Sequence, residues 1–573
     1  MIKKTKNLFN SLNIYDFAII IMIVVSFDIF VLISNKMTEP FKLNNINNIS
    51  LDISMLPEYG FRTIFRMFVS LLVSIIFTFL IAPIAAKNTY FEKIIIPFID
   101  IMESIPILGF LAVSTITFMN FFPNNILGPE LAAIFVIFTS QVWNMILSLY
   151  QSLRNIPKEL EEVSKVFLLS KWKKFWYIEI PYALPNLIWN IMISMSASWF
   201  FIVYSEAISI ANQDILLPGI GSYISKAISQ ANVYAVSCAM LVMFIIILLY
   251  DQILCKPILA WSEKFKLKKN SVYKKEKSWF YNFLVKSNIF KLFKYSIILF
   301  KNNTYKVNFF FKNINGAFYF VEKKKYKKIL IHLFNLISYY LIAKVSWYII
   351  KFLIKNIEIH ELLYVLKLGF FTSCKVFILI VISSIIWVPI GVFIGLSSRK
   401  NLFQPLIQVI AAFPANLFYP IAIIIITYYD LNTEISTIPL MIFGTQWYIL
   451  FNIISGVNSI NNDIHLIGSS MFLRGFLWWK KIILPSIFPF YVTGSIAAAG
   501  GCWNASIAAE VLSWGNLKII STGIGSYIKI ATIVGDFPRL MLGIVVMSFY
   551  VIIINKIIWQ RLYKFSKNKY HYE

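Results

Sequence analysis

The residue types that most often perform catalysis or bind metals are few and widely spaced in this sequence. Its four Cys residues form no CxxC pair, and its four His residues stand alone. Structural zinc sites need such ligands at short spacings, so we expect no metal site and no disulfide framework. A GxxxxGK[ST] phosphate-binding loop is also absent, which argues against ATP hydrolysis by that route within the chain. The scattered residues are Cys238, Cys255, Cys374, Cys502, His332, His360, His465 and His571.

Two Glu residues stand out because they recur at a fixed separation in similar surroundings. Glu206 and Glu510 are 304 residues apart, and each lies near the end of a long apolar segment. Each is followed, at the same spacing, by a glycine pair, namely Gly219 with Gly221 and Gly523 with Gly525. An acid beside such sequence often faces a cavity or a partner, so one hypothesis is an outer gate, with the glycines in a close-packed gate loop, or a contact with a solute-delivering protein. The alternative is structural, with each carboxylate capping a loop and each glycine in a turn that needs positive φ.

These residues belong to an internal repeat that fills most of the sequence. A shift of 304 residues places Trp143 on Trp447 and keeps the alignment without gaps for about eighty positions. Further upstream the shift is 308, so a small insertion separates the two blocks. Each unit has some 200 residues of mostly apolar sequence, far longer than a solenoid repeat. We divide the chain into a first domain at 1–261, a linker at 262–328 and a second domain at 329–573.

The composition is that of an integral membrane protein. Hydrophobic residues make up 58% and charged residues 14% of the chain, against roughly 25% charged in soluble domains. Helices are expected because they satisfy their own backbone hydrogen bonds in lipid. Apolar stretches long enough to span a bilayer recur six times in each half, which predicts an all-α fold of two tandem six-helix domains. The predicted spans are 16–34, 63–86, 94–119, 131–151, 182–204, 233–254, 329–354, 368–396, 403–427, 436–456, 483–505 and 540–559.

The distribution of Lys predicts the orientation of these spans. Much of the net charge of +26 falls in the Lys-rich stretch 256–328. Because Lys and Arg mark cytoplasmic loops, we interpret this charge as a topology signal rather than as nucleic-acid binding. Both termini are then cytoplasmic, and the two halves are parallel about an axis along the membrane normal. Within the linker, Ser287–Phe300 suggests an interfacial helix, with an ordinary tether as the alternative.

The loop between the fourth and fifth spans of the first half has the pattern of a short exposed helix. Asn155 is a candidate N-cap, and Pro157 suits the first helical turn. Glu159 and Glu162 follow, close to the end where the helix dipole favours negative charge. Apolar residues then recur at helical spacing, at Leu160, Val163, Val166 and Phe167. Because no lipid covers such a loop, we expect another protein surface to cover this stripe.

This loop resembles the cytoplasmic loop of permease subunits in bacterial ABC importers. The family pattern is roughly Glu-Ala-Ala, a Gly four residues on, and then Ile-x-Leu-Pro. The coupling-loop residues are Glu159, Glu162, Ser164, Ile178 and Pro181 in the first copy, and Asp463, Gly468, Ile482, Leu484 and Pro485 in the second. The chain departs from the pattern where Leu168 and Phe472 replace the family Gly, and where the second copy lacks the Glu.

The resemblance implies a set of partners for this chain. In that family the loop is a coupling helix that docks in a cleft on an ATPase subunit. It therefore implies two copies of an ABC ATPase that bind the ATP, no cofactor in this chain, and an extracytoplasmic solute-binding protein. It also implies a multi-pass location in the bacterial inner membrane. The segments Trp503–Glu510 and Gly523–Ile528 are similar to nitrate/sulfonate/taurine-type permeases, which implies an anion of the nitrate, sulfonate, sulfate or bicarbonate class.

Two other classes of protein remain as alternatives. A secondary carrier with two six-helix halves needs buried ionisable residues within the spans, and the sequence suggests almost none. A membrane enzyme or assembly factor needs a convergent His, Asp or Ser constellation, which the sequence does not suggest. Prolines inside the second and third spans are expected to kink or break helices, as membrane architecture or as hinges. These are Pro83, Pro106, Pro389 and Pro414.

Overall fold

The computed structural model describes most of the chain. The described residues are 13–37, 49–123, 125–210, 213–265, 278–288, 340, 343–344, 346–397, 400–443, 445–460, 464, 466, 468 and 470–570. Most of the predicted interfacial helix at Ser287–Phe300, much of the predicted span 329–354 and Asp463 lie outside these residues.

Helices account for nearly all of the described residues in both halves. The long helices of the first half are α2 (Ile14–Met37), α3 (Leu56–Lys87), α4 (Thr89–Ser104), α5 (Ile107–Phe121), α6 (Leu127–Arg154), α9 (Ile180–Glu206) and α11 (Val233–Tyr250), which continues into α12 (Lys256–Ser262). The second half contains α17 (Ile359–Leu396), α18 (Lys400–Ala412), α19 (Tyr419–Tyr428), α20 (Thr433–Ser436), α21 (Ile438–Phe443), α22 (Gln446–Ser459), α25 (Leu484–Ala509), α27 (Phe537–Ile554) and α28 (Gln560–Tyr570). The all-α membrane class is confirmed.

The described residues contain seven helices long and apolar enough to cross a membrane, or nine if each bent pair is one span. The third predicted span of each half is not one straight helix. In the first half α4 and α5 are separated by Ile105 and Pro106, and in the second α18 and α19 meet at 72° across the segment that contains Pro414. Proline lacks the N–H that would continue a helix, so these breaks follow from the sequence. Pro83 and Pro389, by contrast, lie inside the continuous helices α3 and α17.

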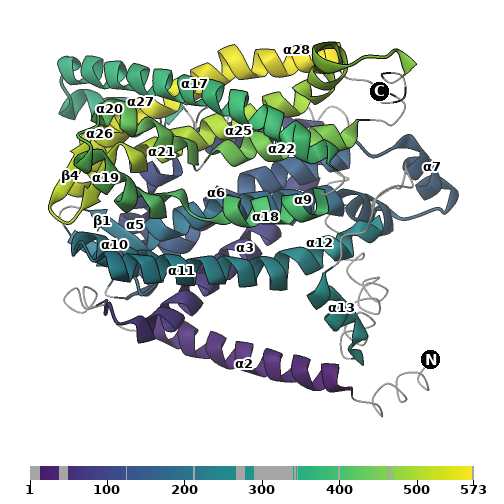
Figure 1. The fold of residues 1–573 in the computed structure, drawn as a ribbon, viewed down its shortest axis with the longest axis horizontal. Coiled ribbons are helices and arrows are strands. Elements are labelled where there is room, and N and C mark those ends of the chain that lie inside the picture. The colour runs from purple at the N-terminus through teal and green to yellow at the C-terminus, as the bar shows by residue number, and fades with distance from the viewer. Residues whose placement is uncertain are drawn as a thin grey trace.

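The long helices run side by side along the longest axis of the molecule (Figure 1). Two β-hairpins with strands of four residues lie at one end of the long helices, and helix α7 (Lys158–Val166) lies at the other end. We call these the hairpin end and the loop end. The two halves contact each other through α4 with α27, α5 with α25, and α18 with α9 and α11. Each half therefore places its broken third span against the other half.

Small residues allow the closest helix contacts within a half. A Cβ on Gly391 or Gly395 of α17 would lie 2.8 Å from Ile453 or Val457 of α22. These two glycines are one helical turn apart and face the same neighbour. Small residues at such spacing let membrane helices approach closely where the hydrophobic effect between helices is weak.

Two antiparallel hairpins form where the sequence predicts only outer loops. Strand β1 (Ala207–Ile210) pairs with β2 (Gln213–Leu216), and β3 (Val511–Trp514) pairs with β4 (Leu517–Ile520). Each hairpin begins directly after a long helix, and the two occupy equivalent places in the repeat. They also cross between the halves, because β1 contacts α26 (Ile524–Val534) and β3 contacts α10 (Ile220–Ser229).

One described part of the linker packs against the first helix. Helix α13 (Trp279–Lys286) ends beside α2, where the buried Asp16 carboxylate accepts hydrogen bonds from Ser287 Oγ and Asn288 N–H, both at 2.7 Å. This part of the linker is therefore bound to the first domain.

Candidate functional site: ion networks at the hairpin end and loops at the loop end

Glu206 is the final residue of α9, and its carboxylate is fully buried against an Arg from α3. Arg66 Nη1 donates to Glu206 Oε1 at 2.7 Å. The same guanidinium makes two bonds to Glu130 at the start of α6, at 2.6 and 2.7 Å. All three side chains are at most 1% exposed. One Arg therefore joins three helices at the hairpin end, in the paired arrangement that buried charges require.

The Glu206 carboxylate also holds the segment that follows the first hairpin. It accepts hydrogen bonds from Thr63 Oγ1 at 2.8 Å and from Gly221 N–H at 2.7 Å, at the beginning of α10. Arg66 donates in addition to the carbonyl of Pro218, at 3.0 Å. The helix dipole favours a negative charge at this N-terminus. The geometry is that of a carboxylate that fixes loop structure, which was the structural alternative for this residue.

The glycines beside Glu206 and Glu510 are needed for close approach, and the expectation of positive φ is wrong. Gly219 has a φ of −178° and Gly523 a φ of 174°, both extended backbone. A Cβ at either position would collide with the carboxyl group of its Glu, and a Cβ on Gly221 would lie 2.5 Å from Val203 O. The backbone thus passes directly over the carboxylate, where no side chain fits.

The second half repeats this network with a Lys in place of the Arg. Lys375 Nζ lies 3.7 Å from Glu510 Oε1 and 3.4 Å from Glu434 Oε2, and donates to Thr522 O at 2.7 Å. Thr372 Oγ1 donates to Glu510 at 3.2 Å, as Thr63 does to Glu206. Glu434 is 41% exposed, whereas its counterpart Glu130 is 1% exposed.

The ion pairs of this second network are weaker than those of the first, because a Lys replaces the Arg. An ammonium is a single point charge, whereas a guanidinium can make two parallel bonds to a carboxylate. Burial raises the pKa of Glu510, just beyond the end of its span, to about 7, although the charge of Lys375 acts in the opposite direction. The two halves thus have equivalent ion networks, and the ion pairing is weaker in the second half.

Sequence reasoning found the two Glu residues and the glycine pairs but missed their cations. A signal was present in the sequence, because Arg66 and Lys375 are both basic and are 309 residues apart, as are Thr63 and Thr372. This separation is one residue more than the shift of 308 found for the neighbouring segment, so the two cations were not aligned. The expectation of almost no buried ionisable residues in the spans is also wrong. Arg66 lies within the span Ile53–Lys87 and is fully buried.

At the loop end, α7 begins later than expected. Asn155 is the C-cap of α6 rather than an N-cap, and Pro157 takes the N-cap position of α7 without a side-chain cap. Glu159 lies in the first turn and Lys165 in the last, as the helix dipole favours. Ser164 is buried and donates to the carbonyl of Glu161 at 2.6 Å.

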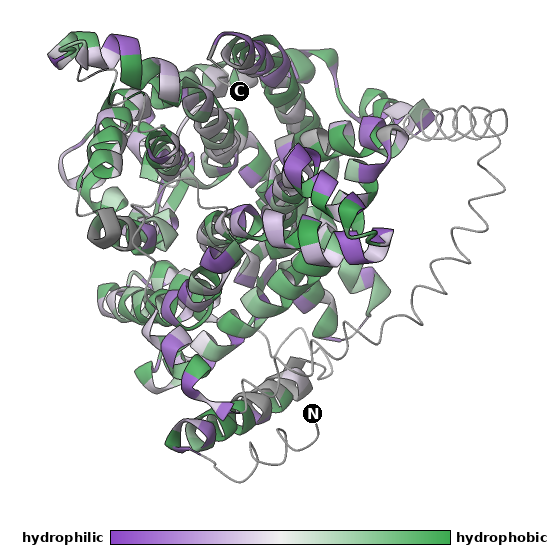
Figure 2. Ribbon diagram, turned by 90° about the vertical axis from the view of Figure 1, so that its right-hand side faces the viewer, coloured by the Kyte–Doolittle hydropathy of each residue, from purple (hydrophilic) through white to green (hydrophobic). Residues whose placement is uncertain are grey.

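Large apolar side chains are exposed where α7 ends. Val166, Phe167 and Leu168 are 78%, 70% and 91% exposed. In the second copy Phe472 is 80% exposed. Figure 2 looks onto this end of the molecule and shows hydrophilic and hydrophobic segments facing the viewer. Exposed apolar groups of this size beside charged residues are typical of a protein interaction surface.

The same turn ends the short loop helix in both copies. Leu168 and Phe472 have φ values of 47° and 50°, in the left-handed region. Leu169 N–H donates to Ser164 O and Leu473 N–H donates to Gly468 O, both at 3.0 Å, which is the bond of a Schellman C-cap. Glycine is the usual residue at this position. The two residues that replace the family Gly are thus both in strained backbone, as are two other non-Gly residues among those described, Ala231 and Asp430.

The remaining coupling-loop residues are divided between loop and helix. Ile178 and Pro181 are half-buried, whereas Ile482 is buried and Leu484 is 45% exposed. Pro485 is half-buried, and Gly468 is buried against Ile482. Glu162 is exposed, without a role in the fold among the described residues. The buried Glu179 pairs with Lys87 at 2.7 Å and so attaches the loop to the end of α3.

Each loop leads into one long helix that reaches the hairpin end. Residues Lys171–Glu206 form an apolar helical span that includes a π-helical turn at Phe175–Glu179. Residues Gly475–Ala509 do the same, with a π-helical turn at Trp479–Ile483. Both spans therefore connect an exposed apolar loop at one end with a Glu-centred network at the other.

Comparisons with known proteins agree with this duplicated architecture. A family described as "Binding-protein-dependent transport system inner membrane component" matches residues 74–254 and 387–564, together more than half of the chain. The bicarbonate transport system permease protein CmpB of Synechococcus elongatus is 25% identical over 181 residues, which are 32% of this chain and 59% of that protein.

Two further relatives match shorter segments. CmpB of Synechocystis is 31% identical over 121 residues, covering 21% of this chain and 41% of the relative. The nitrate import permease protein NrtB of Leptolyngbya laminosa is 28% identical over 113 residues, covering 20% and 38%. The chain thus spans less than two thirds of the length of these relatives. The two family matches nonetheless fall on the two halves of the repeat, so the chain belongs to the inner membrane components of binding-protein-dependent transport systems, as a transport permease with two family domains in tandem.

Proposed function

We propose that this chain is the membrane component of an ATP-driven importer of a small anion, with ATP bound and hydrolysed by separate subunits. The observation that carries the proposal is the pair of exposed apolar loops at repeat-equivalent positions of one end. Two such surfaces on a twofold-like molecule suit two copies of one ATPase. The names of the relatives, which specify bicarbonate and nitrate, support a small oxyanion as the solute.

The fold offers a mechanical route from ATPase to solute. Movement of the first loop is transmitted along the continuous span Lys171–Glu206, because a helix resists bending and stretching. At its far end Glu206 holds the start of α10, and the adjoining hairpin crosses to the other half. Movement of a loop relative to the body is therefore expected to change the contact between the halves at the hairpin end.

The proposed orientation follows from the Lys distribution. The loop end faces the cytoplasm, together with both termini, and the hairpin end receives an extracytoplasmic solute-binding protein. In this arrangement Glu206 and Glu510 lie on the outer side, where they stabilise the structure that surrounds the entrance.

A secondary carrier is the alternative, and the buried charges bear on it. Ion-coupled carriers place ionisable residues where an ion or proton can reach them. Here Arg66, Glu130 and Glu206 satisfy one another and hold loop backbone, so they suit a structural role better than a titrating one.

Copurification provides a direct test of the partner. The chain is expressed together with a candidate ABC ATPase of the same organism, and the membrane extract is purified through a tag on the chain. We expect two ATPase subunits for each chain. Purification of the chain alone, with transport that needs no ATPase, would support the secondary carrier.

Leu168→Gly is expected to weaken ATPase binding several-fold although it relieves backbone strain. A non-Gly residue in the left-handed region costs about 1–2 kcal/mol, so this variant relaxes the turn. The variant is expected to lose binding because it removes the almost fully exposed apolar side chain of Leu168, which we propose contacts the ATPase. The measurement is the dissociation constant of the ATPase for the variant and for the wild type, obtained by titrating the purified ATPase. Equal or tighter binding by the variant would show that the side chain of Leu168 contributes nothing to docking.

A further inference from the structure

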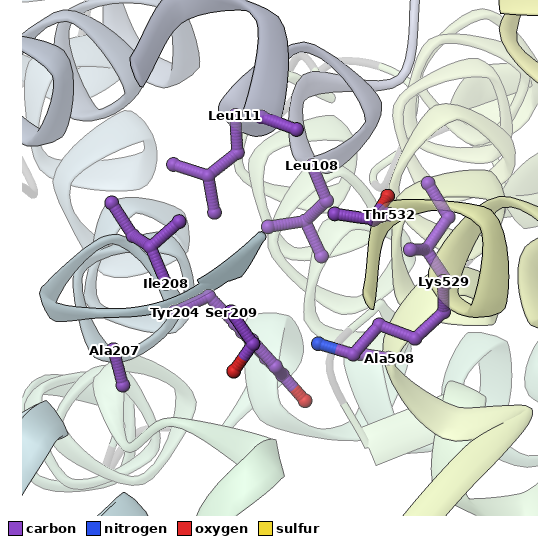
Figure 3. Close-up of a pocket in the computed structure, with 11 residues that line it drawn as sticks. Leu108, Leu111, Tyr204, Ala207, Ile208, Ser209, Ala508, Lys529 and Thr532 are labelled. Carbon is purple, nitrogen blue, oxygen red and sulfur yellow. The ribbon is translucent and has the colours of Figure 1, made fainter. Parts of the chain in front are cut away.

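A small cavity lies between the two halves near the hairpin end. Its walls come from α5 and the α9–β1 junction of the first half, and from α25 and α26 of the second (Figure 3). Tyr204 and Ala508 are repeat equivalents, 304 residues apart, and both line it. A cavity that contains both members of an equivalent pair lies across the pseudo-twofold axis, where a path between the halves must run.

One cationic side chain reaches into this cavity and forms no salt bridge with a carboxylate of the described residues. The amino group of Lys529, from α26, points across it toward Tyr204 and Ser209 (Figure 3). Its Nζ lies 5.5 Å from the centroid of the Tyr204 ring. Asp214 is near enough for its charge to act on Lys529, but no carboxylate of the described residues lies within ion-pair distance. The repeat places Ser225 at the equivalent position, so Lys529 adds a charge that the first half lacks.

The electrostatic surroundings leave this ammonium poorly compensated. Burial lowers the pKa of Lys529, and the charge of Asp214 on β2 only partly opposes this. A bound anion would favour the charged form of the side chain, since an opposite charge nearby stabilises an ion.

Hydroxyl groups complete a set of hydrogen-bond donors. Within the described part of the chain, Tyr204 and Ser209 have no hydrogen-bond partner for their hydroxyls, and both line the cavity. Thr532 also lines it, but its hydroxyl already donates to Ile528 O at 2.8 Å. An ammonium with two free hydroxyls can donate to an oxyanion from several directions. Leu, Ile and Ala side chains form most of the remaining wall, and such low-polarity surroundings strengthen the attraction.

The size of the cavity restricts the anion. Its volume is about 30 Å³, and by a similar measure one water molecule needs about 10–15 Å³. The space therefore suits an ion of a few heavy atoms that has lost most of its water.

We propose that Lys529, with the hydroxyls of Tyr204 and Ser209, binds a small inorganic oxyanion at the pseudo-twofold axis of the permease. The proposal rests on anion import by this protein and assigns the residues that receive the anion between the halves. Because Lys529 belongs to the second half only, the site is asymmetric.

Thermal unfolding of the purified chain–ATPase complex tests the site directly, with sodium nitrate as the probe and sodium gluconate at equal ionic strength as the reference. A ligand that binds only the folded state raises the unfolding temperature. We expect nitrate to raise it in the wild type and in Lys518→Met, which removes an exposed Lys from β4. We expect no nitrate effect in Lys529→Met, and a partial effect in Lys529→Arg. An undiminished nitrate effect in Lys529→Met overturns the proposal.

Uptake of nitrate into proteoliposomes separates this proposal from the proposed function. With binding protein and ATP in excess, Lys529→Met is expected to lower uptake at least tenfold while Lys518→Met transports like the wild type. Uptake by Lys529→Met at the wild-type rate overturns the anion site and leaves the importer intact. If Lys529 serves only to pack against Tyr204, uptake falls in proportion to the loss of folded complex, which the unfolding curves measure, and the site is likewise overturned. Absence of ATP-dependent nitrate or bicarbonate uptake by the wild-type complex counts against the importer itself.

Discussion

Replacing Arg66 with Met is expected to lower the unfolding free energy by about 3–5 kcal/mol, because it leaves two buried carboxylates without their cation. Arg66 bonds to Glu130 and Glu206, and all three side chains are almost completely buried. The variant also loses the bond to Pro218 O that holds the start of α10. We expect the purified protein to unfold at a markedly lower temperature and to have little transport activity.

Two control variants separate the charge effect from the packing effect. Adding Glu130→Gln and Glu206→Gln to Arg66→Met removes the unpaired charges and is expected to restore much of the stability. In the second network, Lys375→Arg is expected to increase stability, because a guanidinium can bond both Glu434 and Glu510 at shorter distances than the present 3.4 and 3.7 Å. An Arg66→Met protein that unfolds at the wild-type temperature would contradict the assignment of this network as a structural anchor.

Placing charges on the first loop is expected to abolish ATPase binding without unfolding the permease. Phe167→Glu together with Leu168→Glu alters two side chains that are 70% and 91% exposed, so the fold loses little. A docking cleft that accepts apolar side chains would instead have to bury two unpaired carboxylates, which costs several kcal/mol. We expect copurified ATPase to fall at least a hundredfold and ATP-driven transport to stop.

A matched substitution at the other end controls for added charge. Leu517→Glu changes an apolar residue of β4 that is 49% exposed at the hairpin end. This variant is expected to retain the ATPase at the wild-type ratio. If the loop variant also retains it, the exposed apolar surface of α7 is not the docking site. In that case, copurification of the ATPase with a Phe472→Glu variant tests whether the second loop alone provides docking.

Features that depend on local sequence could be predicted for this chain. The repeat, the membrane class and the breaks at Pro106 and Pro414 follow from apolar spacing and from the missing proline N–H. The importance of Glu206 and Glu510 also followed from their shared spacing. The loop helix was expected from its apolar stripe, but its start was misplaced by about two residues, because Pro157 rather than Asn155 takes the N-cap position.

Features that depend on contacts between distant segments could not be predicted in the same way. In the sequence, Arg66 is a single cation in an apolar span. Its role becomes clear only from the packing of α6 and α9 against α3. The strands of the hairpins have only four residues, which is too short for an apolar–polar alternation that differs from that of a loop. The hairpins also depend on contacts with the opposite half. The positive φ of Leu168 and Phe472 has no sign in their residue types, since glycine is what that backbone favours.

ATP-driven import can be measured as anion uptake by proteoliposomes that contain the chain, its ATPase and the solute-binding protein. We expect labelled nitrate or bicarbonate to accumulate inside only when ATP is supplied on the loop side and the binding protein on the hairpin side. We expect the Phe167→Glu and Leu168→Glu double variant to accumulate neither anion. Equal accumulation without ATPase, driven by an ion gradient, would show that the chain is not the membrane component of an ATP-driven importer.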